Sequence, residues 1–229
     1  MERIILIETS TALCSTALAE NGTVISYKES SAAKAHASMT AVFIREMLEE
    51  RGISLSDCDA VCVSMGPGSY TGLRVGVSTA KGLCFGSGKP LIAVGTLDTL
   101  VAQASCETDI SDIRFIVPMI DARRMEVYSA VFTPDGKQIT DTAPAIIDES
   151  SFSEYLEQGP VLFIGDGAGK CDGVIRHPNA RFQQCWPKAS SMLSPAVEAY
   201  KEKRFEDVAY FEPFYLKEFV ATVSKKKLF

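Results

Sequence analysis

Residues 66–83 read GPGSYTGLRVGVSTAKGL, and they join an apolar run, Ala60–Ser64, to a longer segment, Thr71–Phe85, in which Arg74 and Lys81 are the only charged residues. This order predicts a strand, a glycine-rich turn and a largely buried helix. Glycines beside hydroxyl side chains are typical of turns that bind phosphate. The stretch therefore predicts either a phosphate-binding turn or a place where two backbones pack closely.

The known nucleotide motifs are absent from this turn. A phosphate-loop NTPase needs G-x-x-x-x-G-K-S/T, but Gly72 is followed by Leu73. A dinucleotide fingerprint needs glycine at position 71, which is a threonine, and the later run GDGAGK at 165–170 has its third glycine one place early. The G-x-S-x-G elbow of serine hydrolases is also missing around Ser69.

Small residues recur on the helix that follows. Gly72, Gly76 and Ala80 stand four residues apart and predict one smooth ridge. Two glycines inside a helix cost about 1 kcal/mol each relative to alanine, which suggests that close packing compensates for them. Packing within the chain and packing against a partner helix both fit this pattern, and we favour the partner.

A second helix, predicted over His36–Arg51 with Gly52 as its C-cap, supports a partner surface. Its apolar residues spread over roughly 240° of the circumference, whereas one core contact needs a stripe of little more than about 100°. These residues are Met39, Val42, Phe43, Ile44, Met47 and Leu48. The two helices together predict an interface with another subunit.

The remaining pattern predicts two lobes of the same design. The first lobe reads β-β-β-α-β-α-β-α, with strands at Arg3–Glu8, Ser15–Ala19, Thr23–Lys28, Ala60–Ser64 and Leu91–Val94 and helices at His36–Arg51, Thr71–Phe85 and Leu97–Ser105. The second repeats this order in shortened form, with strands at Phe115–Ile120, Glu126–Phe132, Gln138–Thr140 and Val161–Ile164 and helices at Ser153–Glu157 and Pro195–Lys203.

We place the boundary between residues 106 and 107 and expect the C-terminal tail to pack back on the first lobe. A β-β-β-α-β-α-β-α unit used twice predicts the α/β actin-like ATPase (ribonuclease H-like) fold, which includes sugar kinases and chaperone ATPases.

In that fold the first β-turn meets phosphate and Mg²⁺, and here it holds Glu8, Thr9, Ser10 and Thr11. The longer arm of Glu8 displaces the carboxylate by about one methylene from where an aspartate would hold it, and Mg²⁺ demands near-ideal octahedral geometry. We expect a vestigial phosphate turn and no ATP hydrolysis by this chain alone.

Composition and charge exclude several functions. A net charge of −6 and a pI near 5.1 give no broad basic surface for nucleic acid. The seven cysteines lack C-x-x-C spacing and are expected to be reduced, while His36 and His177 are isolated, so no metal site is predicted. The apolar run Ile4–Ile7 is too short for a signal peptide, and we expect a cytoplasmic protein.

Two charged segments leave alternatives open. DARRMEVY places Asp121, Arg123, Arg124 and Glu126 together as a catalytic cluster or as an Asp–Arg network that braces a strand end, and we favour the brace. The lysines Lys225–Lys227 near the C-terminus are solvated or touch a phosphate backbone of tRNA weakly.

Three segments together resemble one family. GPGSYTGLRVGVSTAKGL, ILIETSTALCSTALA and DARRMEVY are similar to the TsaB (YeaZ) family, the non-catalytic actin-like subunits of the bacterial machinery for tRNA threonylcarbamoyladenosine at position 37. The likeness is strongest over residues 1–130. The chain departs from many relatives at Glu8, where they carry aspartate, and at Met125, where they carry glycine.

The resemblance implies a scaffold that binds and activates the catalytic subunit TsaD, joined by the ATPase TsaE, with a homodimer competing through the same surface. ATP and a metal ion are then expected on the partner subunits, with none bound by this chain alone. The implied interface comprises His36, Met39, Thr40, Phe43, Met47, Gly72, Val75, Gly76, Thr79, Ala80 and Leu83. The alternative is an independent kinase or ATPase of the same fold.

Overall fold

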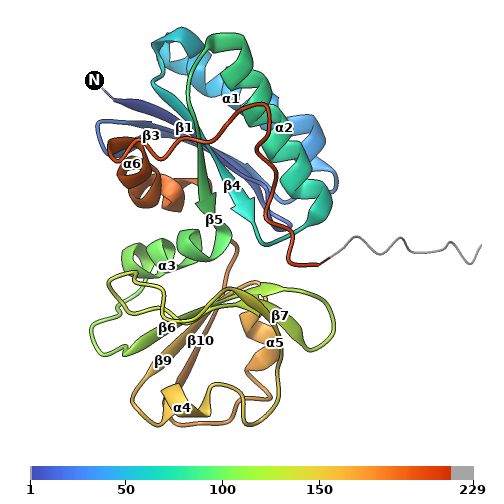
Figure 1. Ribbon diagram of the computed structural model, residues 1–229, viewed down its shortest axis with the longest axis vertical. Helices are drawn as coiled ribbons and strands as arrows, with labels where there is room; N and C mark the ends of the chain where they lie inside the picture. The colour runs from blue at the N-terminus through green and yellow to red at the C-terminus, as the bar shows by residue number, and fades with distance from the viewer. Residues whose placement is uncertain (1, 218–229) are drawn as a thin grey trace, which may run out of the picture.

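The computed structural model describes residues 2–217 and builds two five-stranded mixed sheets, one above the other in Figure 1. The first sheet has the order β3-β2-β1-β4-β5 and contains β1 (Arg3–Glu8), β2 (Cys14–Glu20), β3 (Thr23–Ser30), β4 (Ala60–Gly66) and β5 (Leu91–Gly95). The second has the order β10-β9-β6-β7-β8 and contains β6 (Phe115–Asp121), β7 (Glu126–Ser129), β8 (Ala143–Ile146), β9 (Val161–Gly165) and β10 (Ala180–Gln184).

Strand β1 forms the centre of the first sheet. It pairs antiparallel with β2 and parallel with β4, and Ile4–Ile7 are all buried because the sheet is covered on both faces. The predicted turn between β2 and β3 is present, with Asn21 and Gly22 both at positive φ (50° and 76°). These are the left-handed angles that a two-residue hairpin turn requires.

Helices cover both faces of this sheet. The helices α1 (Ala35–Arg51) and α2 (Tyr70–Ser87) pack Ile44, Met47 and Val77 against one face. The 3₁₀ turn Ala189–Met192 and the helix α6 (Leu193–Lys201) cover the opposite face with Met192 and Ala196. A short 3₁₀ turn, Leu55–Asp57, precedes β4.

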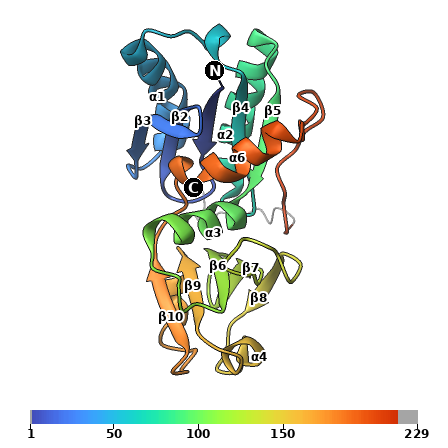
Figure 2. The same ribbon diagram turned by 90° about the vertical axis from the view of Figure 1, so that its left-hand side faces the viewer.

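The helix α3 (Thr96–Glu107) follows β5 but packs on the second sheet, so it lies between the two sheets in Figures 1 and 2. Its residues Leu97, Leu100 and Ala104 share a buried cluster with strands of that sheet. The other face of the second sheet is covered by α4 (Ser153–Leu156) and α5 (Ala168–Cys171). The carboxyl ends of the parallel strands of both sheets therefore approach the region around α3.

The second lobe departs from the sequence prediction at its third strand. That strand was predicted at Gln138–Thr140 but lies at Ala143–Ile146, where it pairs antiparallel with β7. Gln138 instead forms an isolated antiparallel bridge with Phe132, and the amide of Ile139 donates to the carbonyl of Val131 (2.7 Å). These contacts close the hairpin around the TPDGK turn, but they do not extend into a strand. Pro144 is tolerated in this strand because β8 lies at the edge of the sheet.

Several element bounds differ from the prediction by a few residues, and two short elements were not predicted. The strand β7 ends at Ser129 instead of Phe132, and α6 begins at Leu193 rather than at Pro195. The strand β10 and the short helix α5 have no counterpart in the sequence prediction. Both are five residues or fewer, too short to show a periodic pattern.

The chain returns to the first sheet after β10. Following α6, the amide of Glu206 donates to the carbonyl of Leu91 (2.8 Å) at the edge of β5, and Phe211 is buried against the first core. Residues 206–217, called the C-terminal strap below, then run beside α2 (Figure 1). No helix among residues 2–217 is both long and apolar enough to cross a membrane.

Candidate functional site: a helical surface and the strand ends beside it

The turn quoted above begins α2 and holds it against the first turn of the chain. The hydroxyl of Ser69 accepts a hydrogen bond from the amide of Gly72 (3.2 Å), a standard N-cap, and Gly88 ends the helix in the left-handed conformation. The amide of Ser69 also donates to the carbonyl of Ser10 (2.6 Å). The start of α2 is therefore fixed on the Glu8–Thr11 turn.

The glycine ridge faces inward, which corrects the prediction that it serves a partner helix. A Cβ on Gly72 would lie 2.1 Å from the carbonyl oxygen of Thr9, and one on Gly76 would lie 2.2 Å from the Thr9 hydroxyl. Ala80 is fully buried in the same core. These residues are small because β1 and its turn pass directly beneath α2, so close packing within the chain explains them.

The structure divides the predicted interface residues into two groups. Six are buried inside the chain and are not available to a partner in this conformation, namely Thr40, Phe43, Met47, Gly72, Gly76 and Ala80. Five are partly exposed along the outer sides of α1 and α2, namely His36, Met39, Val75, Thr79 and Leu83. Any partner surface on these helices is therefore formed by their outer sides and does not include the buried Gly72–Gly76–Ala80 ridge.

Three residues on the outer face of α2 were missed by the sequence reasoning. Phe85 is 88% exposed, and a Cβ on Gly82 or Gly86 would have no atom within 4 Å. Nothing among residues 2–217 therefore requires glycine at these two positions, although each costs about 1 kcal/mol in helix propensity. Gly82 lies six residues after Gly76, which places it about 120° away from the ridge on the helix, and this offset is the signal that could have identified the outer face.

At the end of β1, the carboxyl group of Glu8 is closed off from solvent. It is 0% exposed, and its Oε1 accepts hydrogen bonds from the amide of Ser10 (2.6 Å) and the hydroxyl of Ser64 (3.0 Å). Burial raises the pKa of Glu8 to about 7. Its Oε2 and the buried hydroxyls of Ser10 and Thr11 have no hydrogen-bond partner among the described residues.

This turn does not fit Mg²⁺ in the conformation described. Mg²⁺ usually keeps several waters and binds one or two carboxylates, which needs an accessible carboxylate oxygen. Glu8 offers none, and residues 2–217 contain no group of three or more His, Cys, Asp or Glu side chains suited to a metal. The imidazole Nε2 of His36 instead lies 2.8 Å from the carbonyl oxygen of Thr11, which ties α1 to the same turn.

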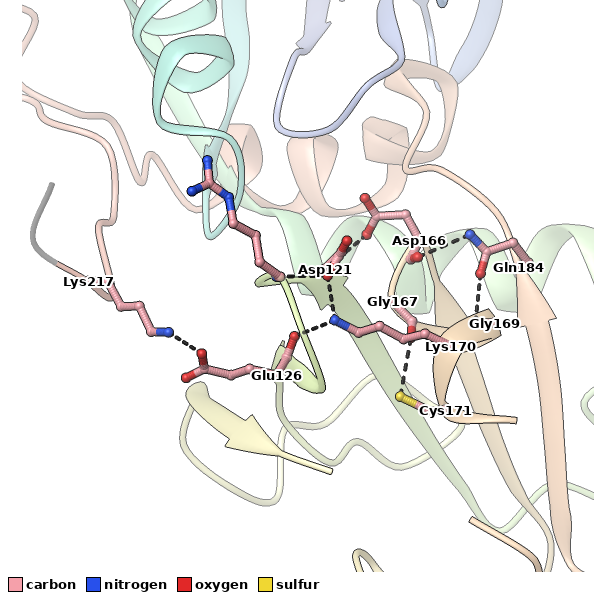
Figure 3. A network of polar contacts seen from close by, with 10 residues as sticks. Asp121, Glu126, Asp166, Gly167, Gly169, Lys170, Cys171, Gln184 and Lys217 are labelled. Carbon is pink, nitrogen blue, oxygen red and sulfur yellow. Dashed lines mark hydrogen bonds and ion pairs between the residues drawn. The ribbon is translucent and has the colours of Figure 1, made fainter. Parts of the chain in front are cut away.

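The corresponding strand ends of the second sheet carry a network of polar contacts (Figure 3). The ammonium of Lys170 binds the carboxylate of Asp121 and the main-chain carbonyl of Glu126 (2.6 Å). Asp166 accepts from the amide of Asp121 (2.9 Å), and burial raises the pKa of Asp166 to about 6. The network holds the turn between β6 and β7 in place.

The sequence predicted that an arginine pairs with Asp121 in this brace. That prediction is wrong, because the cation that pairs with Asp121 is Lys170. Arg123 contributes its main-chain amide to Asp121 (2.8 Å), and among the described residues neither Arg123 nor Arg124 forms an ion pair. Both arginines have positive φ (72° and 52°), so they form a tight turn.

The tripeptides GPG (66–68) and GDG (165–167) occupy equivalent places in the two sheets, at the ends of β4 and β9. Gly66 and Gly165 end β4 and β9 with positive φ (108° and 131°), where an L side chain is strained. A Cβ on Gly165 would lie 2.3 Å from the carbonyl of Met119, and one on Gly68 would lie 2.3 Å from the carbonyl of Ser10. Glycine in the motifs GPG and GDG therefore allows the strand ends to approach neighbouring backbone closely.

The cysteines, His177 and the C-terminal lysines were the other candidates in the sequence. All seven cysteines are free. His177 lies in a turn where its Nδ1 accepts from the amide of Asn179 (3.2 Å). The lysines Lys225–Lys227 lie outside the described residues.

Comparison with known families finds similarity to proteins of tRNA threonylcarbamoyladenosine biosynthesis. The family model of TsaD, described as tRNA N6-adenosine threonylcarbamoyltransferase, matches residues 25–223. The tRNA threonylcarbamoyladenosine biosynthesis protein TsaB of Escherichia coli is 31% identical over 229 aligned residues, which cover 96% of each chain. The protein of the same name from Haemophilus influenzae is 38% identical and covers 93% of each.

Solved structures agree with the sequence relatives. A Pseudomonas aeruginosa protein described as similar to the peptidase YEAZ superposes with a TM-score of 0.84 at 26% identity, covering 95% of this chain and all of the other. The activator of 2-hydroxyisocaproyl-CoA dehydratase from Clostridium difficile, solved with bound ADPNP, shares the fold with a TM-score of 0.50 at 10% identity, covering 88% of this chain and 96% of that one. The predicted actin-like ATPase fold is confirmed.

Proposed function

The chain belongs to the TsaB (YeaZ) family of tRNA threonylcarbamoyladenosine biosynthesis proteins, and from this membership we propose that it acts as a non-catalytic subunit that binds and activates a TsaD-type threonylcarbamoyltransferase. The observation that carries the proposal is the near-complete alignment with TsaB proteins. The match to the TsaD family model is neutral on catalysis, since it reports shared ancestry of the fold.

The buried Glu8 turn supports a non-catalytic role. Phosphoryl transfer depends on positioned metal and phosphate ligands, and the only carboxylate in this turn is closed off by Ser10, Ser64 and the start of α2. ATP and a metal ion belong to the partner subunits in this proposal. Steady ATP hydrolysis by the purified chain would contradict it and would favour an independent kinase or ATPase.

We propose the outer face of α1 and α2 as the partner surface. Met39, Val75 and Leu83 supply partly exposed apolar side chains, and Gly82 and Gly86 let another backbone approach closely. Small residues at helix contacts permit such an approach in general. A second copy of this chain competes for the same surface, and a TsaE-type ATPase joins only the assembled pair.

Enlarging Gly82 tests this surface. We expect Gly82→Trp to weaken binding of the TsaD-type subunit at least about tenfold, because the indole stands between the two helix backbones. The same change at Gly173, where an added Cβ also meets nothing within 4 Å, is the matched control on the second lobe. Calorimetric titration measures both affinities, and thermal melting checks that both variants fold.

Reconstituting tRNA modification tests the activating role. The TsaD-type and TsaE-type subunits with tRNA are expected to form threonylcarbamoyladenosine only when this chain is added, and Gly82→Trp is expected to reduce the yield in proportion to the lost affinity. Equal affinity for the Gly82 and Gly173 variants would remove the outer face of α2 from the interface. Full activity without the chain would refute the activating role itself.

A further inference from the structure

The C-terminal strap, residues 206–217, touches both lobes. Its first part is anchored firmly on the first lobe, where Phe211 is buried and the amide of Phe214 donates to the carbonyl of Met65 (2.7 Å). The ammonium of Lys81 on α2 donates to the carbonyls of Ala209 and Phe211, both at 3.0 Å. The main chain of the strap is therefore held along the length of α2.

Close approach of the strap depends on Gly66. A Cβ at this position would lie 2.8 Å from the carbonyl oxygen of Phe214. Two features therefore require glycine at the end of β4: the positive φ of this residue and the close approach of the strap. The strap is fitted to this strand end and does not simply lie across it.

The end of the strap contacts the first turn of α2. The ring of Tyr215 packs against the ring of Tyr70 with their centroids 4.9 Å apart. The guanidinium of Arg74 lies over the Tyr70 ring (4.2 Å), and its Nε donates to the hydroxyl of Tyr215 (3.3 Å). These side chains form a small stack at the N-terminal end of the helix that we propose for partner binding.

Two residues later the strap reaches the second lobe. The ammonium of Lys217 binds the carboxylate of Glu126 on β7 (Figure 3). It also lies 5.9 Å from the centre of the Tyr128 ring. The main-chain carbonyl of Glu126 is held by Lys170, which also binds Asp121. The strap thus continues into the network that holds the β6–β7 turn.

We propose that the strap is a latch that couples the first turn of α2 to the β6–β7 turn of the second lobe, Asp121–Glu126, through Tyr215 and Lys217. Its attachment to the first lobe uses buried and main-chain contacts, whereas its attachment to the second lobe uses a partly exposed ion pair. Exposed ion pairs are weak and are screened by salt. The latch therefore opens at the second lobe while the strap stays on α2.

This arrangement transmits changes at α2 to the other lobe. A group that displaces Arg74 or Tyr70 removes the support of Tyr215, and Lys217 then loses its position beside Glu126. The meaning of this coupling for a bound subunit rests on the proposed function, but the latch itself is a property of this chain alone.

Hydrogen exchange on the full chain without any partner tests the latch. We expect Lys217→Ala, Tyr215→Ala and Arg74→Ala each to speed amide exchange in residues 121–126 by roughly two- to fivefold. Tyr210→Ala is the matched control, because Tyr210 is in the same strap but 84% exposed. In wild type, about 1 M salt is expected to reproduce the effect of Lys217→Ala, since it screens the ion pair.

Thermal melting and exchange of the β1 amides report whether the variants remain folded. Wild-type exchange at 121–126 in all three variants, Lys217→Ala, Tyr215→Ala and Arg74→Ala, would overturn the proposal. An equal increase in Tyr210→Ala would also overturn it, because the effect would then not depend on the latch contacts. Both results are independent of whether a TsaD-type subunit binds the chain.

Discussion

Gly72→Ala is expected to lower the free energy of unfolding by about 3 kcal/mol or more, whereas Gly82→Ala ten residues later is expected to raise it by about 1 kcal/mol. The added methyl group at Gly72 would lie 2.1 Å from the main-chain oxygen of Thr9, a distance that only a shift of α2 or of β1 relieves. Both elements belong to the buried core, so the shift disturbs packing on both sides.

At Gly82 the same methyl group meets nothing within 4 Å. Alanine then improves helix propensity and reduces the conformational freedom of the unfolded chain without a steric cost. The two substitutions are chemically identical and lie on one helix, which makes them matched controls for each other. Urea denaturation followed by circular dichroism measures both changes.

The outcome separates the two explanations of the glycines. A stable, well-folded Gly72→Ala protein would mean that α2 does not rest on the Glu8–Thr11 turn as described. A destabilised Gly82→Ala protein would mean that the outer face of α2 is packed within the chain. Either result would also change the proposed partner surface, because that surface assumes that the inner face is occupied and the outer face is free.

Glu8 is expected to make the protein less stable as the pH rises from 5 to 8. Burial raises its pKa from 4.5 to about 7 in the folded state, so between about pH 5 and pH 7 the unfolded chain has lost the proton that the folded chain still holds. The stabilising contribution is complete below pH 4.5 and is lost as the pH rises through 7. One pKa unit corresponds to about 1.4 kcal/mol, so the full loss is about 3 kcal/mol.

Glu8→Gln isolates this contribution, because glutamine keeps the acceptor for Ser10 and Ser64 but does not ionise. The stability of the variant relative to wild type is expected to increase by about 2 kcal/mol between pH 5 and pH 8. Asp166, whose pKa burial raises to about 6, is present in both proteins and cancels in the comparison.

Urea midpoints at several pH values measure the difference, with Glu149→Gln on the exposed surface as the control. Parallel pH profiles for wild type and Glu8→Gln would contradict the burial of the carboxyl group. The burial of Glu8 is the main structural argument against a nucleotide site in this chain. Such a result would remove that argument, because an accessible carboxylate in this turn could bind a cation.

Much of the fold is readable from the sequence. The strand β1 is a continuous apolar run ended by Glu8, the β2–β3 turn carries Asn21–Gly22, and α1 and α2 each end before a glycine in the left-handed conformation. These signals are local, because propensity, apolar periodicity and turn residues act over a few neighbours. The short elements β8, α5 and β10 were missed because they form through contacts with other strands.

The candidate site was only partly readable, for a physical reason visible in α2. The sequence shows glycines at positions 72, 76 and 82, but helical spacing alone does not say which side of the helix faces the sheet. That side is decided by Thr9, which is distant in the sequence and fills the space beside Gly72 and Gly76. Lys170 likewise takes the place expected for arginine beside Asp121 because α5 brings it there.

The sequence by itself therefore determined most of the strands, the main helices, the fold class and the family, since these depend on local pattern and on motifs that survive divergence. Only the tertiary structure decided which glycines are buried, where Glu8 is closed off and how the strap joins the lobes. These features are contacts between residues far apart in the chain, and such contacts exist only after the core has packed.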